Sequence, residues 1–167
     1  MALNIYPYDR AAAVAYAREW AMGRNPAYAD FEEMGGDCSN FISQVLLAGG
    51  AVMNYTPHTG WYFKSLGDRA AAWTGVPYLY NFLTTNQGRG PFGHVVPIEE
   101  VQPGDIIQLK FAGKEDFSHS LMVLETGEPP APDNIMIAAH TYDSVDRPLD
   151  SYSYVEARGI HIDGVRK

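Results

Sequence analysis

The chain has 167 residues, 46% hydrophobic and 19% charged, which is ordinary for a folded globular protein and argues against a disordered chain. Its net charge of −8 argues against nucleic acid or an anionic membrane surface as the main partner. No apolar run is long enough for a transmembrane helix. Cys38 is the single cysteine, which excludes an internal disulfide and a zinc site rich in thiolates.

The first predicted helix covers residues 10–23, with Asp9 as its N-cap and Gly23 at its end. Apolar residues recur along it at the spacing of one helix face, so it should pack that face on a core. These residues are Ala13, Tyr16, Ala17 and Trp20.

A second helix is predicted over residues 38–48, because Asp37 can serve as its N-cap and Gly49-Gly50 can end it. Cys38 shares a face with the apolar stripe of this helix, so its sulfur should point toward whatever the helix packs on. The stripe consists of Phe41, Ile42, Val45 and Leu46.

The middle of the chain, residues 51–100, has a mixed pattern in which short helices are predicted near 61–72 and 79–86. After Pro103 the pattern becomes strand-like. Helices that precede strands, without βαβ alternation, predict an α+β domain with an antiparallel sheet, formed by residues 1–167 as one unit. The predicted strands are 106–111, 118–125, 135–141 and one or two strands near 152–162.

Cys38 is the first candidate for chemistry. A lone cysteine is commonly a small buried hydrophobe. Here, however, it begins a helix, where the macrodipole favours a thiolate, and it follows Gly35-Gly36-Asp37, which lets the backbone turn sharply.

Two histidines can join the cysteine if strands 118–125 and 135–141 form an antiparallel hairpin. Pairing residue 125 with 134 would place His119 opposite His140 on one face. His119 would then be the general base for the thiol, and His140 would orient His119, with Asp143 as the second choice for that role.

The oxyanion of an acyl-transfer reaction would be met by the N–H of Cys38 and by one further donor. Tyr28 is a candidate for that donor, although an ordinary packed loop tyrosine is an equally good interpretation. Asp37 and Ser39, which flank the cysteine, and Trp61, a possible groove residue or core residue, complete the oxyanion and substrate candidates.

The run Gly-Gly-Asp-Cys-Ser-Asn-Phe-Ile-Ser-Gln at residues 35–44 resembles the bacterial putative amidase domain family. The resemblance extends over nearly the whole chain. Further matching segments are Asn25-Pro26-x-Tyr28, Trp61-Tyr62, Gly104-Asp105-Ile106-Ile107, Ser118-His119-Ser120 and Ala139-His140-Thr141.

This resemblance implies a papain-like fold related to NlpC-type and CHAP cell-wall hydrolases. It implies that Cys38 is the nucleophile, His119 the base and His140 the orienting residue of a Cys-His-His triad. The implied reaction is cleavage of an amide or peptide bond, with cell-wall peptide as the usual substrate among relatives, and no cofactor is expected. Relatives of this kind act outside the cell or at its surface, whereas residues 1–5 do not begin a signal peptide. We expect a monomer.

Three alternatives remain open at the level of sequence. An amine could replace water in the last step, which would give a transglutaminase-like acyl transferase. Cys38, His119 and His140 could instead bind zinc, although no His-Glu-x-x-His pattern is present. The chain could also be a catalytically silent module that binds peptide or cell wall.

Overall fold

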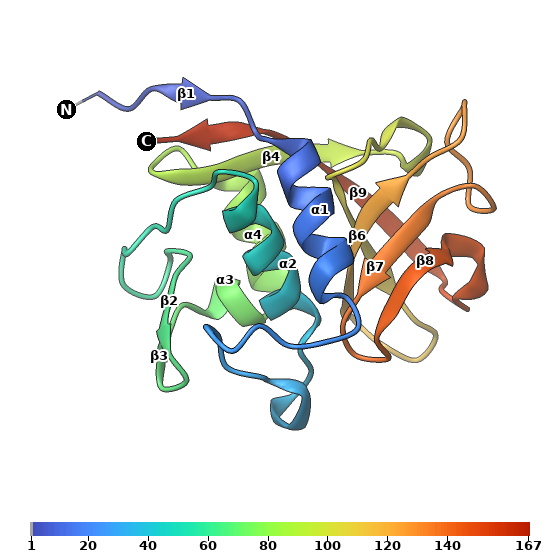
Figure 1. Ribbon diagram of the computed structural model, residues 1–167, viewed down its shortest axis with the longest axis horizontal. Coiled ribbons are helices and arrows are strands. Elements are labelled where there is room, and N and C mark those ends of the chain that lie inside the picture. The colour runs from blue at the N-terminus through green and yellow to red at the C-terminus, as the bar shows by residue number, and fades with distance from the viewer. Residues whose placement is uncertain (1) are drawn as a thin grey trace.

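Helices occupy the first half of the chain and most strands the second half, as the change of pattern after Pro103 predicts. The computed structural model describes residues 2–167 (Figure 1). Its helices are α1 (Arg10–Trp20), α2 (Cys38–Ala48), α3 (Ala71–Thr74) and α4 (Val76–Thr85), with 3-10 turns at Glu32–Met34, Ile98–Glu100 and Leu149–Ser151. Its strands are β1 (Ile5–Tyr6), β2 (Phe63–Ser65), β3 (Asp68–Arg69), β4 (Gly90–Val96), β5 (Ile106–Lys110), β6 (His119–Glu125), β7 (Met136–Ala139), β8 (Ser144–Pro148) and β9 (Glu156–Arg166).

The main sheet is antiparallel and runs in the order β1-β9-β5-β6-β7-β8, with β4 also paired to β9. The long strand β9 pairs with β5 through its first half and with β4 through its second half. Helices α1, α2 and α4 lie together beside this sheet (Figure 1), and Arg18 of α1 pairs with Asp146 of β8 at the edge of the sheet. The chain is therefore an α+β domain with an antiparallel sheet, as predicted.

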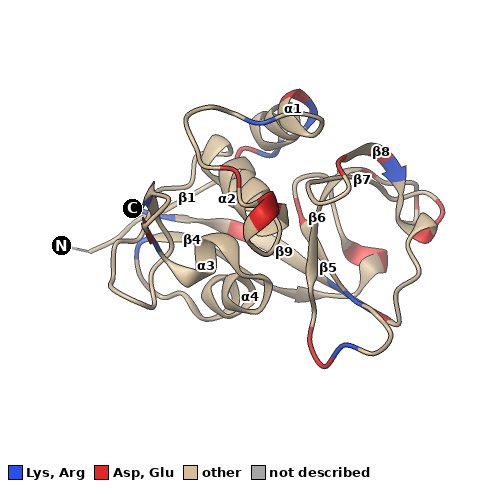
Figure 2. Cartoon of the chain, turned by 90° about the horizontal axis from the view of Figure 1, so that it is seen from below, with Lys and Arg blue, Asp and Glu red and all other residues tan. Residues whose placement is uncertain are grey.

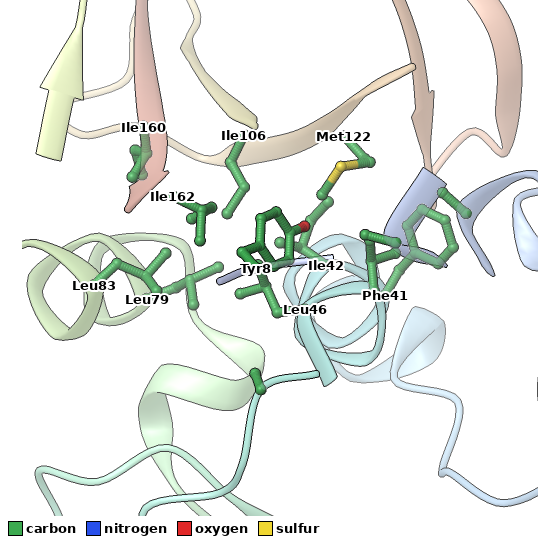
Figure 3. Packing of buried hydrophobic residues seen from close by; sticks show 14 of the residues in the cluster. Tyr8, Phe41, Ile42, Leu46, Leu79, Leu83, Ile106, Met122, Ile160 and Ile162 are labelled. Atoms are coloured by element: carbon green, nitrogen blue, oxygen red, sulfur yellow. The ribbon is translucent and has the colours of Figure 1, made fainter. Parts of the chain in front are cut away.

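Two hydrophobic clusters form on the two faces of the sheet, because alternate residues of a strand point to opposite faces. Met122 and Leu124 of β6 belong to the cluster that contains the helices. Leu121 and Val123 of the same strand belong to a second cluster enclosed by the strands and their loops. Figure 3 shows the first cluster, in which Ile42 and Leu46 of α2 lie near residues of the sheet; the labelled members are Tyr8, Phe41, Ile42, Leu46, Leu79, Leu83, Ile106, Met122, Ile160 and Ile162.

The two helices that frame the cysteine were predicted closely. Asp9 caps α1 by accepting a hydrogen bond from the Ala12 N–H at 3.0 Å. Helix α2 begins at Cys38 and ends at Ala48 as expected, but it is buried on all sides from Cys38 to Leu46 rather than along one stripe. This helix is central to the domain, with α1 and α3 on it and β6 behind it.

The middle segment was predicted less well. In place of a helix over 61–72, the chain forms the β2–β3 hairpin and then the short helix α3, whereas α4 matches the helix expected near 79–86. Strands β4 and β8 were missed. Glycine and proline interrupt the pattern in β4, and β8 is a polar edge strand, so neither carries the alternation that identifies a strand.

The pairing of β6 with β7 differs from the predicted register by one residue at Met122 and Val123 and by two residues at Glu125. Met122 lies opposite Ala138, and a bulge separates the pairs at Val123 and Glu125. A shift of one residue moves side chains to the other face of the sheet. The prediction that His119 lies opposite His140 is therefore wrong.

Acidic residues outnumber basic ones, 20 to 12, and they are spread over several elements of the domain (Figure 2). Within residues 2–167, the structure contains no helix with the length and apolar character needed to cross a bilayer.

Candidate active site

Cys38 is the first residue of α2 and is 7% exposed. The Ser39 hydroxyl lies 4.0 Å from its sulfur and 3.2 Å from the Ser120 hydroxyl, so the cysteine lies near the start of β6. The turn into the helix passes through Gly36, whose φ of 110° is accessible mainly to glycine; a Cβ there would also lie 3.1 Å from the Thr141 hydroxyl. The glycine turn before the cysteine thus positions the start of α2 close to the start of β6.

Burial raises the pKa of the Cys38 thiol, and the Asp37 charge acts in the same direction, although the nearby N–H and hydroxyl groups lower the pKa in part. The helix start was expected to favour a thiolate. In the resting protein the opposite effect is larger, because the sulfur is removed from water. Burial therefore favours the neutral thiol of Cys38 over its thiolate.

Asp37 was predicted to cap α2 with its side chain, but it makes no such bond. Its carboxylate is fully buried, and Oδ1 accepts hydrogen bonds from the Phe31 N–H and the Asn40 amide, each at 2.8 Å. Its Oδ2 lies 2.5 Å from His140 Nδ1 and 3.5 Å from the Arg24 guanidinium. Asp37 thus ties the loop before the helix to the end of β7.

The expected pairing of His140 with His119 is not found. His140 Nδ1 faces Asp37, and its Nε2 donates to the Trp20 carbonyl at 2.8 Å. Its ring also stacks on Phe41 with centroids 4.2 Å apart. Since both nitrogens are occupied on the helix side of the sheet, His140 holds the Asp37 loop rather than the base.

Asp143, the second choice for an orienting residue, is also engaged elsewhere. Its two carboxylate oxygens accept hydrogen bonds from Arg24 at 2.9 and 3.1 Å. The arginine is drawn toward this loop because Asp30 and Asp37 lie near it as well. Asp143 therefore helps, through Arg24, to hold the loop that precedes Cys38.

His119 is the first residue of β6 and is 6% exposed. Burial, together with the positive charge of Arg147, lowers the pKa of His119 from 6.5 to about 4. Its ring lies against Tyr152 and Phe111, with centroids 5.7 and 6.4 Å away, and forms no hydrogen bond to any described residue. At neutral pH His119 is an uncharged base that aromatic rings hold in place.

A cavity of about 450 Å³ opens beside His119. Its wall is mostly apolar, and it is formed where β5, β6 and the β7–β8 connection meet. Thr141 in this wall accepts a hydrogen bond from the Asp37 N–H at 3.0 Å, so the cavity borders the residue that precedes Cys38. The lining residues are Phe111, Ser118, His119, Thr141, Tyr142, Arg147 and Tyr152.

The remaining predicted candidates have structural environments. Tyr28 is half-buried, with its ring 6.0 Å from that of Trp73 and 5.7 Å from that of Phe63, as a packed loop tyrosine would be. Trp61 is completely buried and donates to the Ser43 hydroxyl at 3.0 Å, so it is a core residue and not a groove residue. The Ser39 hydroxyl lies 3.2 Å from that of Ser120 and braces α2 against β6.

The structure does not gather Cys38, His119 and His140 into a ligand set. No group of three or more His, Cys, Asp or Glu side chains in the described part of the chain has the geometry to hold a metal ion.

Sequence reasoning missed Arg147 and Tyr152, both of which line the cavity at His119. Arg147 lies in β8, the polar edge strand, and Tyr152 follows the 3-10 turn after it. An arginine and a tyrosine five residues apart carry no motif, and only the return of β8 beside β7 brings them to the histidine.

Comparison with known proteins gives a family but no characterised relative. A family model described as "Putative amidase domain" matches residues 7–162. The chain is similar to a curated protein of Bacillus subtilis (strain 168) named "Uncharacterized protein YhbB", with 36% identity over 141 residues. That match covers 83% of this chain and 43% of the relative, so the chain spans less than half of the relative's length. No solved structure gives a significant match.

Proposed function

This chain belongs to the family described as the Putative amidase domain, and on that premise we propose that it is a cysteine amidohydrolase with Cys38 as nucleophile and His119 as general base. The family indicates amidase activity in general. One observation supports the cysteine mechanism: the hydroxyl of Ser39, next to Cys38, lies 3.2 Å from the hydroxyl of Ser120, next to His119. In this proposal the nucleophile and the base act together at the start of β6.

The reaction begins from a neutral pair, since the pKa of the thiol is raised and the pKa of His119 is lowered to about 4. As the sulfur attacks the carbonyl carbon, His119 takes the thiol proton and the carbonyl electron pair moves to oxygen. The tetrahedral intermediate then expels the amine as the C–N bond breaks, and the imidazolium returns the proton to the leaving nitrogen. An imidazolium of low pKa is a strong acid, which suits that second transfer.

Hydrolysis of the thioester completes the cycle. His119 takes a proton from water, the hydroxide adds to the acyl carbon, and the C–S bond breaks as the proton returns to sulfur. The oxyanion of both steps is best met by the first N–H groups of α2, which have no acceptor within the helix. Packing against Phe111 and Tyr152 keeps the imidazole in place, a role that sequence assigned to His140.

The substrate and the wider relationship are proposed on the resemblance alone. The Gly-Gly-Asp-Cys-Ser-Asn-Phe run favours a papain-like hydrolase of the NlpC and CHAP type, and cell-wall peptide as the substrate. Residues 1–167 would then form the catalytic domain.

The test is hydrolysis of a panel of short peptides, including cell-wall stem peptides, with new amines quantified by mass spectrometry. The parent protein should release an amine and a carboxylic acid in equal amounts, and Cys38→Ala should release neither while it keeps the parent circular dichroism spectrum. Equal activity of the two proteins would overturn the mechanism. Adding a primary amine would reveal acyl transfer as a third product.

A further inference from the structure

The cavity beside His119 contains a cation that no carboxylate neutralises. Arg147 makes no ion pair with any described residue, while its acidic neighbours in the chain are engaged elsewhere: Asp143 binds Arg24, and Asp146 binds Arg18. This is unexpected in a chain with a net charge of −8, which has more carboxylates than cations. β8, in which Arg147 is the only basic residue, lies at the edge of the sheet (Figure 2).

The guanidinium is held in position but not saturated. Its Nε donates to the Ser151 hydroxyl at 2.7 Å, and its Cζ lies 3.6 Å from the centroid of the Tyr152 ring. Longer contacts at 3.4 and 3.5 Å engage one N–H of each terminal nitrogen. Because arginine has five N–H groups, two remain without a protein acceptor, one on each terminal nitrogen. That pair of donors matches the two oxygens of a carboxylate.

Tyr152 forms part of the same wall. Its hydroxyl is shut off from solvent. The phenol stays protonated, because burial raises its pKa more than the nearby Arg147 and Ser144 lower it. The rest of the wall is mostly apolar, with Phe111 on one side and the 86% exposed Tyr142 at the rim.

We propose that this cavity is a substrate subsite that binds an apolar residue bearing a free carboxylate, with Arg147 as its specificity-determining residue. The inference deepens the proposed function, on which it rests: the favoured amides are those in which a carboxylate adjoins the scissile bond. Arg147 binds the carboxylate and the apolar wall covers the side chain, while His119 lines the same cavity. A neutral amide in place of the carboxylate loses the charge-assisted bonds.

The test uses two small probes of matched shape, 3-phenylpropanoate and 3-phenylpropanamide, and a Cys38→Ala background that prevents turnover of the amide. Binding is followed by NMR through the ring signals of His119 and Tyr152. The acid should bind about tenfold more tightly than the amide, the effect expected of hydrogen bonds to a charged group. Arg147→Gln should abolish that preference, and Arg147→Lys should retain part of it, since lysine keeps the charge but not the paired donors.

Arg89→Gln is the matched control, because Arg89 is exposed in the loop between α4 and β4 and its side chain makes no ion pair or hydrogen bond with a described residue. It changes the net charge by the same amount as Arg147→Gln and should leave the affinities for the acid and for the amide unaltered. Equal binding of acid and amide to the Cys38→Ala protein, no binding of either, or a preference that survives in Arg147→Gln would overturn the inference. A preference for the acid, in a parent protein that hydrolyses no amide, would uphold the subsite and refute the proposed function.

Discussion

Replacing His119 by glutamine should reduce, by about 3 kcal/mol, the loss of stability that the domain suffers between pH 7.5 and pH 4. In the unfolded chain this imidazole titrates near 6.5, whereas burial lowers the pKa of His119 in the folded protein to about 4. Between these values the unfolded chain binds the extra proton, so stability is fully present above pH 6.5 and is lost as the pH falls toward 4. At about 1.4 kcal/mol per pKa unit, the loss is about 3 kcal/mol.

The assay is urea denaturation of the parent and His119→Gln proteins at pH 7.5 and pH 4. Carboxylates also titrate in this range, so the informative quantity is the difference between the two proteins in the free energy lost. The variant should lose about 3 kcal/mol less than the parent. His58→Gln, at an exposed loop position, is the control and should lose as much as the parent. Equal losses in the parent and His119→Gln would refute the burial argument for the base.

Three further predictions concern the same site. The kcat/KM for amide hydrolysis should fall with decreasing pH only near pH 4, where His119 gains a proton. Arg147→Gln should shift this fall to higher pH, because the positive charge that lowers the pKa of His119 is removed. A fall near pH 6.5 in the parent would contradict both expectations. Alkylation of Cys38 by a small neutral reagent at pH 7 should be slower than that of a free thiol, because burial raises the pKa of the cysteine; faster labelling would show a resting thiolate. Asp37→Ala should cost about 3–5 kcal/mol in urea denaturation, since it removes a buried acceptor from His140, from Asn40 and from the Phe31 N–H. Asp143→Ala, at a partly exposed ion pair, should cost under about 1 kcal/mol; similar costs would contradict the central place of Asp37.

The parts of this fold that follow from local pattern could be predicted from the sequence. The cap at Asp9, the helix start at Cys38 and the strands β5 and β6 carry strong local signals, and the structure contains them. Strand β8 lacks such a signal because an edge strand with one face in water can be polar throughout.

The site was predicted in part for a related reason. The helix start at Cys38 and the strand start at His119 are readable locally, and the contact between Ser39 and Ser120 joins these two starts. The partner of His119 depended on the register of β6 and β7, and a bulge after Val123 shifts that register. Within the uniformly apolar run from Leu121 to Leu124, no residue marks the bulge. His140 therefore lies on the other face of the sheet, against Asp37.

The most direct test of the central claim is to trap the acyl-enzyme. The protein is mixed with a peptide substrate, quenched in acid within the first turnover, digested and analysed by mass spectrometry. The account predicts that the peptide containing Cys38 gains the mass of the acyl group as a thioester, and that the His119→Gln variant forms it far more slowly. Amide hydrolysis that proceeds at full rate with no acyl group on Cys38 would contradict the account.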